Sequence, residues 1–469
     1  MPRILTLLSL LSLSLCYSPG VYAQEREEEE EDAFFIRRIY DVALTEGRCY
    51  DWLRALSTDY GGRLSGSPQA AAAVEYTRQM LDTLGLDSVW LQACRVPHWE
   101  RGDTERVRIV NSPSRGSIDL GGLALGNSVG TGPEGLSAEV IEVQGLDDLE
   151  LLGPEALAGK IVFFSRPMDP TPIRTVTDYG GAVDQRVYGA ARAARYGAVA
   201  VLVRSITTSR DDVPHTGVTV YEDETPRIPA IAISTLDADL LSGLLRQEVV
   251  RVYLQANCRT YPDKLSYNVI GEIKGTRYPE EIILVGGHLD SWDVAGGAHD
   301  DGAGCVHAMD VLQVMRRLGY RPQRTLRCVL FMNEENGLRG GLEYARVSNE
   351  RGEFHLAAIE SDAGGFTPRG FSCDGEASIF VDRFKSVIDR FYLLEPYGLS
   401  LSKGGSGADI GPLKSQRGLL FGFRPDSQRY FDYHHTANDN FDAVNKRELE
   451  MGVAAISSLV YLLDKYGTD

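Results

Sequence analysis

The sequence predicts an α/β fold in which a mainly parallel sheet is covered by helices on both faces and a second unit is inserted. From residue 267 onward, buried apolar strands alternate with helical segments, the pattern of parallel sheets with helices on each side. The stretch 121–257 has its own short apolar strands between turn residues, which indicates a separate unit. With 469 residues, 43% of them hydrophobic, the chain is long enough for more than one core.

Residues 1–23 have the three parts of a secretory signal. Arg3 supplies the positive charge, residues 4–15 form an apolar run, and Val21-Tyr22-Ala23 is a small-x-small cleavage site. The apolar run is too short to span a bilayer. We therefore expect cleavage after Ala23 and a secreted or periplasmic protein. The acidic stretch 24–32 is expected to remain a disordered tail or a short pro-segment.

The charge balance narrows the classes of partner. A net charge of −18 repels nucleic acid and anionic membranes, so neither is expected as a partner. Six cysteines follow Cys16, and none has C-x-x-C spacing. An exported protein allows disulfides, but the sequence leaves the pairing open.

The first part of the chain, 33–120, is assigned to the main domain. Apolar residues three and four apart predict helices over most of 33–85, interrupted by the turn-rich segment 60–68. Short alternating strands are expected next. Within the inserted unit, strands are predicted near 157–165 and 228–234, and a helix followed by a buried strand over 190–203. Because this unit lacks clustered His, Glu or Cys, its expected role is architectural or substrate-shielding.

The remainder, 258–469, completes the main domain. Strands are predicted over 267–275, 280–290, 325–333, 356–365 and 418–423, and helices over 302–319, 340–347 and 446–466. Active sites of such folds lie beyond the carboxyl ends of the strands. Polar residues that follow these strands are therefore the candidates for chemistry.

Polar clusters occur at those positions. They are His288 with Asp290, Asp300 with Asp301, Glu334 with Glu335, Asp362 by itself, and His434 and His435 with Asp439. Gathering so many carboxylates in one place is prohibitive unless cations neutralise them. Two histidines with several carboxylates and no thiolate suit two zinc ions, with cobalt or manganese as alternatives.

The order of these motifs resembles that of the two-zinc aminopeptidase and carboxypeptidase family. GGHLDSWDVAGGAHDDGAG, NEENG, ESDAGG and HHTANDN carry the resemblance, which extends over about 33–465 and includes a middle segment similar to a protease-associated domain. It implies the zinc exopeptidase fold, a possible homodimer and these metal ligands: His288, Asp300 and Asp362 for one zinc, and Glu335, His435 and the bridging Asp300 for the other.

The same resemblance implies that Glu334 is the general base. Adjacent residues of an extended segment point opposite ways, which would let Glu335 face a metal and Glu334 face the attacking water. Asp290 is expected to orient the imidazole of His288 with its carboxylate. Asp409 and Asp439 are weaker candidates for such support, and Asp301 for shaping the backbone beside Asp300.

The other histidines near the motifs are predicted to bind no metal. Spacing to Asp439 favours His435 over His434 as the ligand. His299 is expected to pack or hydrogen-bond, and His307 is expected to be structural. The glycine pairs near residues 286 and 296 lack the spacing of a phosphate-binding loop.

The predicted function is an exported zinc exopeptidase acting on dipeptides or short peptides. One alternative is an aminopeptidase on longer peptides, because no residue declares itself as the reader of a peptide terminus. A second is a non-catalytic, receptor-like binding protein, against which the complete set of ligand positions argues. A third is an acyl-transfer enzyme that cyclises N-terminal glutamine, a related fold that works with one zinc.

Overall fold

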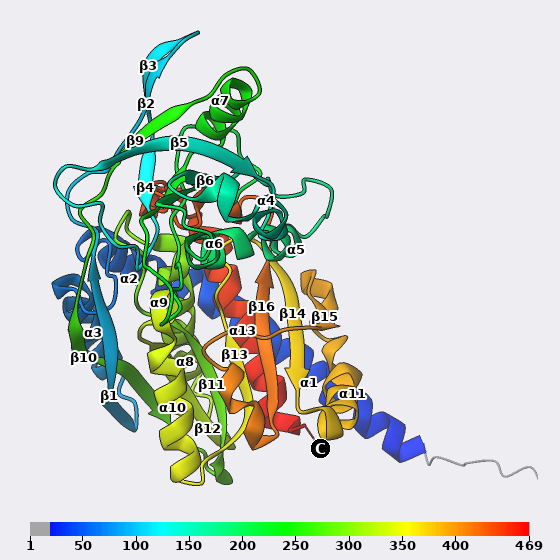
Figure 1. Ribbon diagram of the computed structural model, residues 1–469. Coiled ribbons are helices and arrows are strands. Elements are labelled where there is room, and N and C mark those ends of the chain that lie inside the picture. The colour runs from blue at the N-terminus through cyan, green and yellow to red at the C-terminus, as the bar shows by residue number, and fades with distance from the viewer. Residues whose placement is uncertain (1–18, 469) are drawn as a thin grey trace, which may run out of the picture.

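The computed structural model describes residues 19–468, which form two eight-stranded sheets (Figure 1). The strands of the first sheet, in spatial order, are β1 (Ser88–Glu100), β10 (Arg259–Ile273), β12 (Arg324–Phe331), β11 (Tyr278–His288), β13 (Phe354–Glu360), β16 (Leu419–Pro425), β14 (Pro368–Gly375) and β15 (Ser400–Lys403). The predicted α/β class is confirmed by this arrangement and by the helices around it.

Four of the seven strand pairs in the first sheet are parallel, so the predicted mainly parallel sheet has antiparallel pairs on both sides of its centre. The four central strands, β12, β11, β13 and β16, are parallel, whereas β10 runs antiparallel to β12 and to β1, and β14 runs antiparallel to β16. The chain leaves the sheet after β1 and returns as β10, so these two strands meet as the arms of a long hairpin would. The parallel centre is the part that carries the predicted motifs.

Helices cover both faces of this sheet, as predicted. The helices α1 (Pro19–Glu46), α2 (Cys49–Thr58), α3 (Pro68–Asp82), α8 (Ala303–Arg317), α11 (Ala377–Phe391) and α13 (Lys446–Tyr466) share a core with one face. The other face packs on α10 (Arg339–Glu350) and the 3-10 helix η3 (Gly411–Gln416). Neighbouring residues of β11 separate accordingly, because successive strand side chains point to opposite faces: Val285 joins the first core and Leu284 the second.

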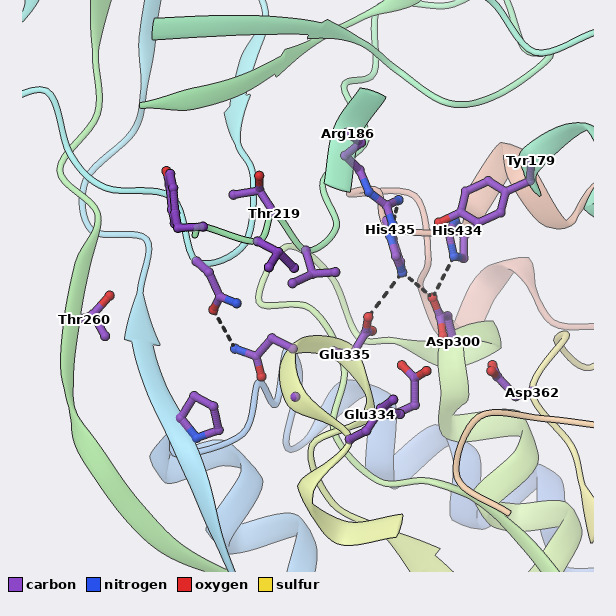
Figure 2. Close-up of a pocket in the computed structure, with 18 of the residues that line it drawn as sticks. Tyr179, Arg186, Thr219, Thr260, Asp300, Glu334, Glu335, Asp362, His434 and His435 are labelled. Atoms are coloured by element: carbon purple, nitrogen blue, oxygen red, sulfur yellow. Dashed lines mark hydrogen bonds and ion pairs between the residues drawn. The ribbon is translucent and has the colours of Figure 1, made fainter. Parts of the chain in front are cut away.

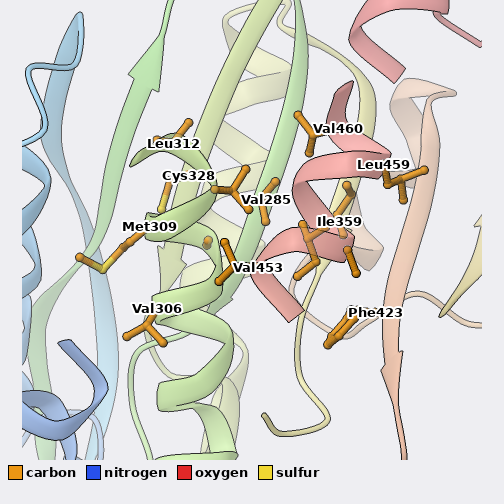
Figure 3. Close-up of a cluster of buried hydrophobic side chains, with 14 of the residues drawn as sticks. Val285, Val306, Met309, Leu312, Cys328, Ile359, Phe423, Val453, Leu459 and Val460 are labelled. Atoms are coloured by element: carbon orange, nitrogen blue, oxygen red, sulfur yellow. The ribbon is translucent and has the colours of Figure 1, made fainter. Parts of the chain in front are cut away.

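The larger core lies between α8, α13 and the central strands (Figure 3). Met309 and Leu312 of α8 and Val453 of α13 belong to one buried cluster with Val285 and Ile359 of the sheet. These side chains are all at most 4% exposed. Close packing of this kind holds the carboxyl ends of the central strands at fixed positions.

The second sheet is built from residues between β1 and β10. Its order is β3 (Gly116–Leu120), β2 (Arg106–Ser112), β9 (Arg251–Gln255), β5 (Leu136–Val143), β6 (Ile161–Phe164), β7 (Ala200–Arg204), β8 (Ala230–Ile233) and β4 (Gly122–Ala124). The helices α4 (Asp147–Leu157), α5 (Thr175–Ala182), α6 (Asp184–Ala194) and α7 (Thr235–Leu245) accompany it. In Figure 1 this sheet lies beyond the end of the first sheet to which β16 points.

The start of this second unit differs from the predicted boundary at residue 121. Strands β2 and β3 had been assigned to the main domain, but β2 pairs with β9 and β3 pairs with β2. Alternation of apolar and polar residues predicts a strand without saying which sheet it joins, so the boundary could not be placed from the pattern. The second sheet begins at Arg106.

The N-terminal region also differs from expectation. The signal segment lies largely outside the described residues, but residues 24–32 belong to helix α1 instead of a disordered tail. At the end of this stretch, Asp32 is buried and accepts hydrogen bonds from Tyr461 (2.6 Å), Lys465 (2.5 Å) and Tyr466 of α13. These contacts stabilise a helix that its acidic run alone would not favour.

Two further properties follow from the described residues. None of their helices combines the length and the apolar character needed to cross a membrane. The six cysteines after Cys16 are all buried and free, so no disulfide forms within the part of the chain that the structure describes.

Candidate metal centre

The candidate ligands converge at the carboxyl ends of the four central strands. His288 is the last residue of β11, Glu335 lies in α9 (Glu334–Gly337) after β12, and Asp362 follows β13. His435 follows α12 (Tyr430–Tyr433), which comes after β16, and Asp300 lies in the π-helix η1 (Ala298–Gly302). This is the edge at which parallel sheets place their sites.

Asp300 stands between two groups of candidate ligands. Its Oδ1 lies 3.2 Å from His288 Nε2, which is also 3.5 Å from Asp362 Oδ1. Its Oδ2 lies 3.2 Å from His435 Nε2, which is also 3.2 Å from Glu335 Oε2 (Figure 2). The five residues that the sequence singled out therefore meet as two sets of three, with one carboxylate common to both.

The donors of this cluster fit divalent cations. His288 Nε2, Asp300 Oδ2 and Glu335 Oε1 are buried, and within the described residues they have no hydrogen-bond partner. Burial, and then the charge of Asp300, raises the pKa of Glu335 to about 7, so the bare carboxylates repel one another. Imidazole nitrogens and carboxylate oxygens without thiolate suit zinc in a hydrolytic site.

Two other residues come close enough to be weighed as ligands. Asp301 groups with His288 and Asp362 within 4.8 Å, but its oxygens accept hydrogen bonds from the amides of His288 and Gly304. His434 Nε2 is 3.6 Å from Asp300 Oδ2, farther than that of His435, and its ring stacks on the His435 ring. His435 therefore remains the candidate ligand in preference to His434, and the Asp301 carboxylate fixes the neighbouring backbone.

Asp290 acts differently from the prediction. Its backbone carbonyl lies 2.9 Å from His288 Nδ1, whereas its carboxylate is 3.8 Å away from that nitrogen. The carboxylate instead accepts hydrogen bonds from the amides of Asn333 and Glu334, at 2.6 and 3.0 Å. Its contribution is to hold the turn that presents Glu334, while a main-chain oxygen orients the imidazole.

That turn also changes the argument about Glu334 and Glu335. They lie in the short helix α9 rather than in an extended segment, so strand alternation does not separate their side chains. Asn333 precedes them with a left-handed backbone (φ 75°), a conformation that Asn tolerates better than most residues. After this reversal, Glu334 lines the cavity together with Asp300 and Asp362 (Figure 2).

Asp439 holds the backbone on which Asp300 lies. Its two oxygens accept the amides of His299 (2.7 Å) and Asp300 (3.0 Å), which fixes the backbone of η1. Asp409, by contrast, has no hydrogen bond to either carboxylate oxygen within the described residues, and burial raises its pKa well above the usual range.

The remaining histidines have structural contacts. The His299 ring stacks on Phe366 with centroids 4.1 Å apart. The ring nitrogens of His307 lie 3.0 Å from the Ser361 hydroxyl and 3.1 Å from the Leu449 carbonyl. Neither ring contributes to the candidate ligand sets.

The loop that carries His435 is held by contacts with the second unit, and the sequence did not predict these contacts. His435 has a left-handed backbone (φ 63°), unusual for a non-glycine residue. Thr216 donates its amide to the His435 carbonyl (2.9 Å), and its own carbonyl lies 3.3 Å from His435 Nδ1. Thr207 donates to the Phe431 carbonyl at 2.7 Å, and Ser209 to Asp432 at 2.5 Å.

The two units enclose a cavity of about 690 Å³ over the ligand cluster. The first unit supplies Asp300, Glu334, Glu335, Asp362 and His435 to its lining. The second supplies Tyr179, Arg186, Thr219 and Tyr221, among others (Figure 2). No sequence motif marked these residues, since their position depends on how the two units pack. A site of this size accepts a small ligand such as a short peptide.

Comparison with known proteins bears on this centre. The family model "Peptidase family M28" matches residues 268–460, which hold all five candidate ligands. Carboxypeptidase Q of Bos taurus is 34% identical, and the match covers 97% of this chain and 95% of that protein. The chain therefore belongs to peptidase family M28 and is a metallopeptidase. Carboxypeptidase Q of Xenopus laevis is 35% identical, and this match covers 93% of this chain and 92% of that protein.

Solved structures agree with the fold. The peptidase M28 precursor of Shewanella amazonensis superposes with a TM-score of 0.87 at 33% identity, covering 93% of this chain and 97% of that one. A zinc aminopeptidase from Bacillus subtilis superposes with a TM-score of 0.62 at 20% identity over 88% and 94% of the two chains. The second likeness concerns the fold alone. The resemblance inferred from the motifs is confirmed.

Proposed function

We propose that the chain is an exported exopeptidase that hydrolyses dipeptides or short peptides with two zinc ions. The observation that carries the proposal is the position of Asp300, whose two oxygens each face a separate pair of candidate ligands at 3.2 Å from a histidine nitrogen. A carboxylate placed in this way suits a bridge between two cations.

The chain supplies two ligand sets for this reaction. His288, Asp300 and Asp362 would hold one ion, and Asp300, Glu335 and His435 the other. When bound, the two ions would lower the pKa of a shared water toward 7 and polarise the carbonyl of the scissile bond. Cobalt or manganese would fit the same donors.

Glu334 is the residue proposed to move the proton. Glu334 lines the cavity. Its backbone is fixed because the amides of Asn333 and Glu334 donate hydrogen bonds to the Asp290 carboxylate. From there the Glu334 carboxylate takes a proton from the attacking water and returns it to the leaving amine.

Export, substrate length and assembly are further parts of the proposal. Residues 1–23 support export by their sequence alone, and the middle unit is proposed to be of the protease-associated type. The cavity over the ligands favours short peptides. The homodimer implied by the family resemblance stays a prediction, which light scattering of the purified protein tests.

Metal depletion tests the proposal directly. The purified chain is treated with a chelator, assayed on dipeptides and longer peptides, and then assayed again after titration with zinc or cobalt. We expect activity to disappear and to return as two equivalents bind. Activity that is indifferent to chelation contradicts the scheme, and a zinc-free, inactive protein favours the receptor-like alternative. Preference for longer peptides that requires a free N-terminus favours the aminopeptidase alternative.

A further inference from the structure

A buried guanidinium faces the candidate centre from the second unit. Arg186 lies on α6, is only 5% exposed and lines the cavity over the ligands. Figure 2 shows its side chain pointing from α6 toward His435. Its Nη1 is 3.4 Å from His435 Nδ1, which places the cation directly behind a candidate ligand.

This cation has no counter-charge among the residues that the structure describes. Within the described residues Arg186 takes part in no ion pair, and its Nε is buried without a hydrogen-bond partner. The guanidinium also lies over the ring of Tyr179, whose centroid is 5.5 Å from the guanidinium carbon, and packs against the backbone of Gly217. A buried charge without a partner is costly, so an anionic ligand group that pairs with Arg186 would remove that cost.

Metal binding would remove the acceptor that His435 offers to Arg186. If His435 Nε2 binds a metal, the ring proton resides on Nδ1 and is donated to the Thr216 carbonyl at 3.3 Å. Nδ1 then offers no lone pair to Nη1 of Arg186. In the metal-loaded protein the guanidinium therefore needs another acceptor, and the open side of its surroundings is the cavity.

The other charges of the cavity indicate what that acceptor is. All the carboxylates that line it from the described residues, namely Asp300, Glu334, Glu335 and Asp362, belong to the candidate centre. None is left over to bind a peptide ammonium group. The other lining arginine, Arg227, is exposed and lies over the ring of Tyr221. The cavity is thus equipped for an anionic group beside His435.

We propose that Arg186 binds the α-carboxylate of the residue that follows the scissile bond, so that the enzyme requires a free C-terminus one residue beyond the cut. The inference rests on the proposed function for the position of the scissile bond. One residue of extended chain spans about 3.3–3.6 Å, so a carboxylate this close to the centre belongs to a dipeptide or to a C-terminal residue. The guanidinium fork binds a carboxylate through two parallel hydrogen bonds.

The test compares a dipeptide with its C-terminal amide in the zinc-loaded protein. Hydrolysis is followed as kcat and KM, and binding is followed by calorimetry with the same two peptides. The variants are Arg186→Gln, which removes the charge, and Arg186→Lys, which keeps the charge but not the fork. Arg192→Gln is the matched control, because Arg192 is an exposed arginine of the same helix, paired with Glu222. Zinc content and circular dichroism are measured for each protein.

We expect the unaltered protein to prefer the acid over the amide by on the order of 10–100-fold, mainly through KM. Arg186→Gln should abolish this preference, because it weakens binding of the dipeptide acid and leaves binding of the amide unchanged. Arg186→Lys should retain part of the preference, and Arg192→Gln should retain all of it. Zinc content should be the same throughout.

Equal use of acid and amide by the unaltered protein, or an unchanged preference in Arg186→Gln, overturns the inference. Should no peptide be cleaved, the proposed function fails, yet calorimetry still decides the role of Arg186. Binding of the acid that depends on Arg186 supports it, and binding that does not depend on it, or no binding, overturns it.

Discussion

The two sheets each contain four adjacent parallel strands, but the residues that follow those strands differ. In the first sheet, β11, β12 and β13 are followed by His288, Glu335 and Asp362 or end in them. In the second, β5, β6, β7 and β8 are also parallel, but small hydroxyl residues such as Ser205 and Ser234 come next. Those hydroxyls bind backbone: Ser234 caps α7, and Ser205 accepts the amide of His215.

The difference shows that topology provides a place for a site and side chains decide its use. The strand ends of the first unit bring the candidate ligands together, and the loops after the strands of the second unit hold the segment that bears His435. Thr207 and Ser209, which follow β7, bind Phe431 and Asp432. One unit is thus proposed to perform the chemistry and the other to position it.

The largest expected effect comes from Asp300, the residue shared by both ligand sets. In Asp300→Ala, each ion would lose a ligand, so we expect a loss of both zinc equivalents and a fall in kcat of about 10⁴-fold or more. Elemental analysis and peptide hydrolysis measure this. The control is Asp382→Ala, which removes an exposed carboxylate of α11 and should change neither. Retention of two tightly bound zinc ions in Asp300→Ala would refute the bridge.

Replacement of Glu334 should separate chemistry from metal binding. Glu334→Gln keeps the shape of the side chain but cannot accept a proton, so we expect kcat to fall by roughly 10²–10⁴-fold while both zinc ions remain. Kinetics together with metal analysis test this, with the exposed Glu350→Gln as control. Normal turnover in Glu334→Gln would show that another group is the base.

The positioning role of the second unit should give a smaller effect. Thr207→Val removes the hydrogen bond to the buried Phe431 carbonyl, which loosens the segment before His435. We expect the affinity for one of the two zinc equivalents to weaken by about tenfold, and the other to stay unchanged. Thr235→Val is the control, since Thr235 is equally buried in the second unit but bonds to Asp211 instead. Equal zinc affinities in Thr207→Val and Thr235→Val would contradict the role of Thr207 in positioning the segment before His435.

The smallest effect on activity is expected for a buried carboxylate outside the site. Asp310 of α8 accepts the amides of Arg48 and Cys49 at the start of α2, and burial raises its pKa to about 6. Because its pKa is higher folded than unfolded, its contribution to stability is complete below about pH 4 and is lost as the pH rises through about 6.

Asp310→Asn should therefore remove a pH-dependent difference on the order of 2 kcal/mol between pH 4 and pH 7 without changing zinc content. Denaturant unfolding of both proteins at several pH values measures this difference. A parallel stability profile for the two proteins would contradict the assignment. Loss of zinc would show that the centre depends on more than its own strand ends.

The sequence predicted those parts of the molecule that are formed by residues close together in the chain. The strands β11, β12 and β13, and the ligands that follow them, are contiguous segments, so periodicity and motif spacing were enough to find them. Arg186 and Thr216 were missed because their link to His435 spans more than two hundred residues and depends on packing between the units. The role of Asp290 was mistaken for a related reason, since main-chain and side-chain oxygens of one residue cannot be told apart in a sequence.

Helix α1, the first part of the described chain, packs on α13, the last helix, and Asp32 joins the two through Tyr461 and Lys465. The main core includes Ile36 and Ile39 of α1 beside side chains of α13. Synthesis must therefore reach the final helix before the core can be sealed. Removal of either of these two helices would therefore expose the same interior.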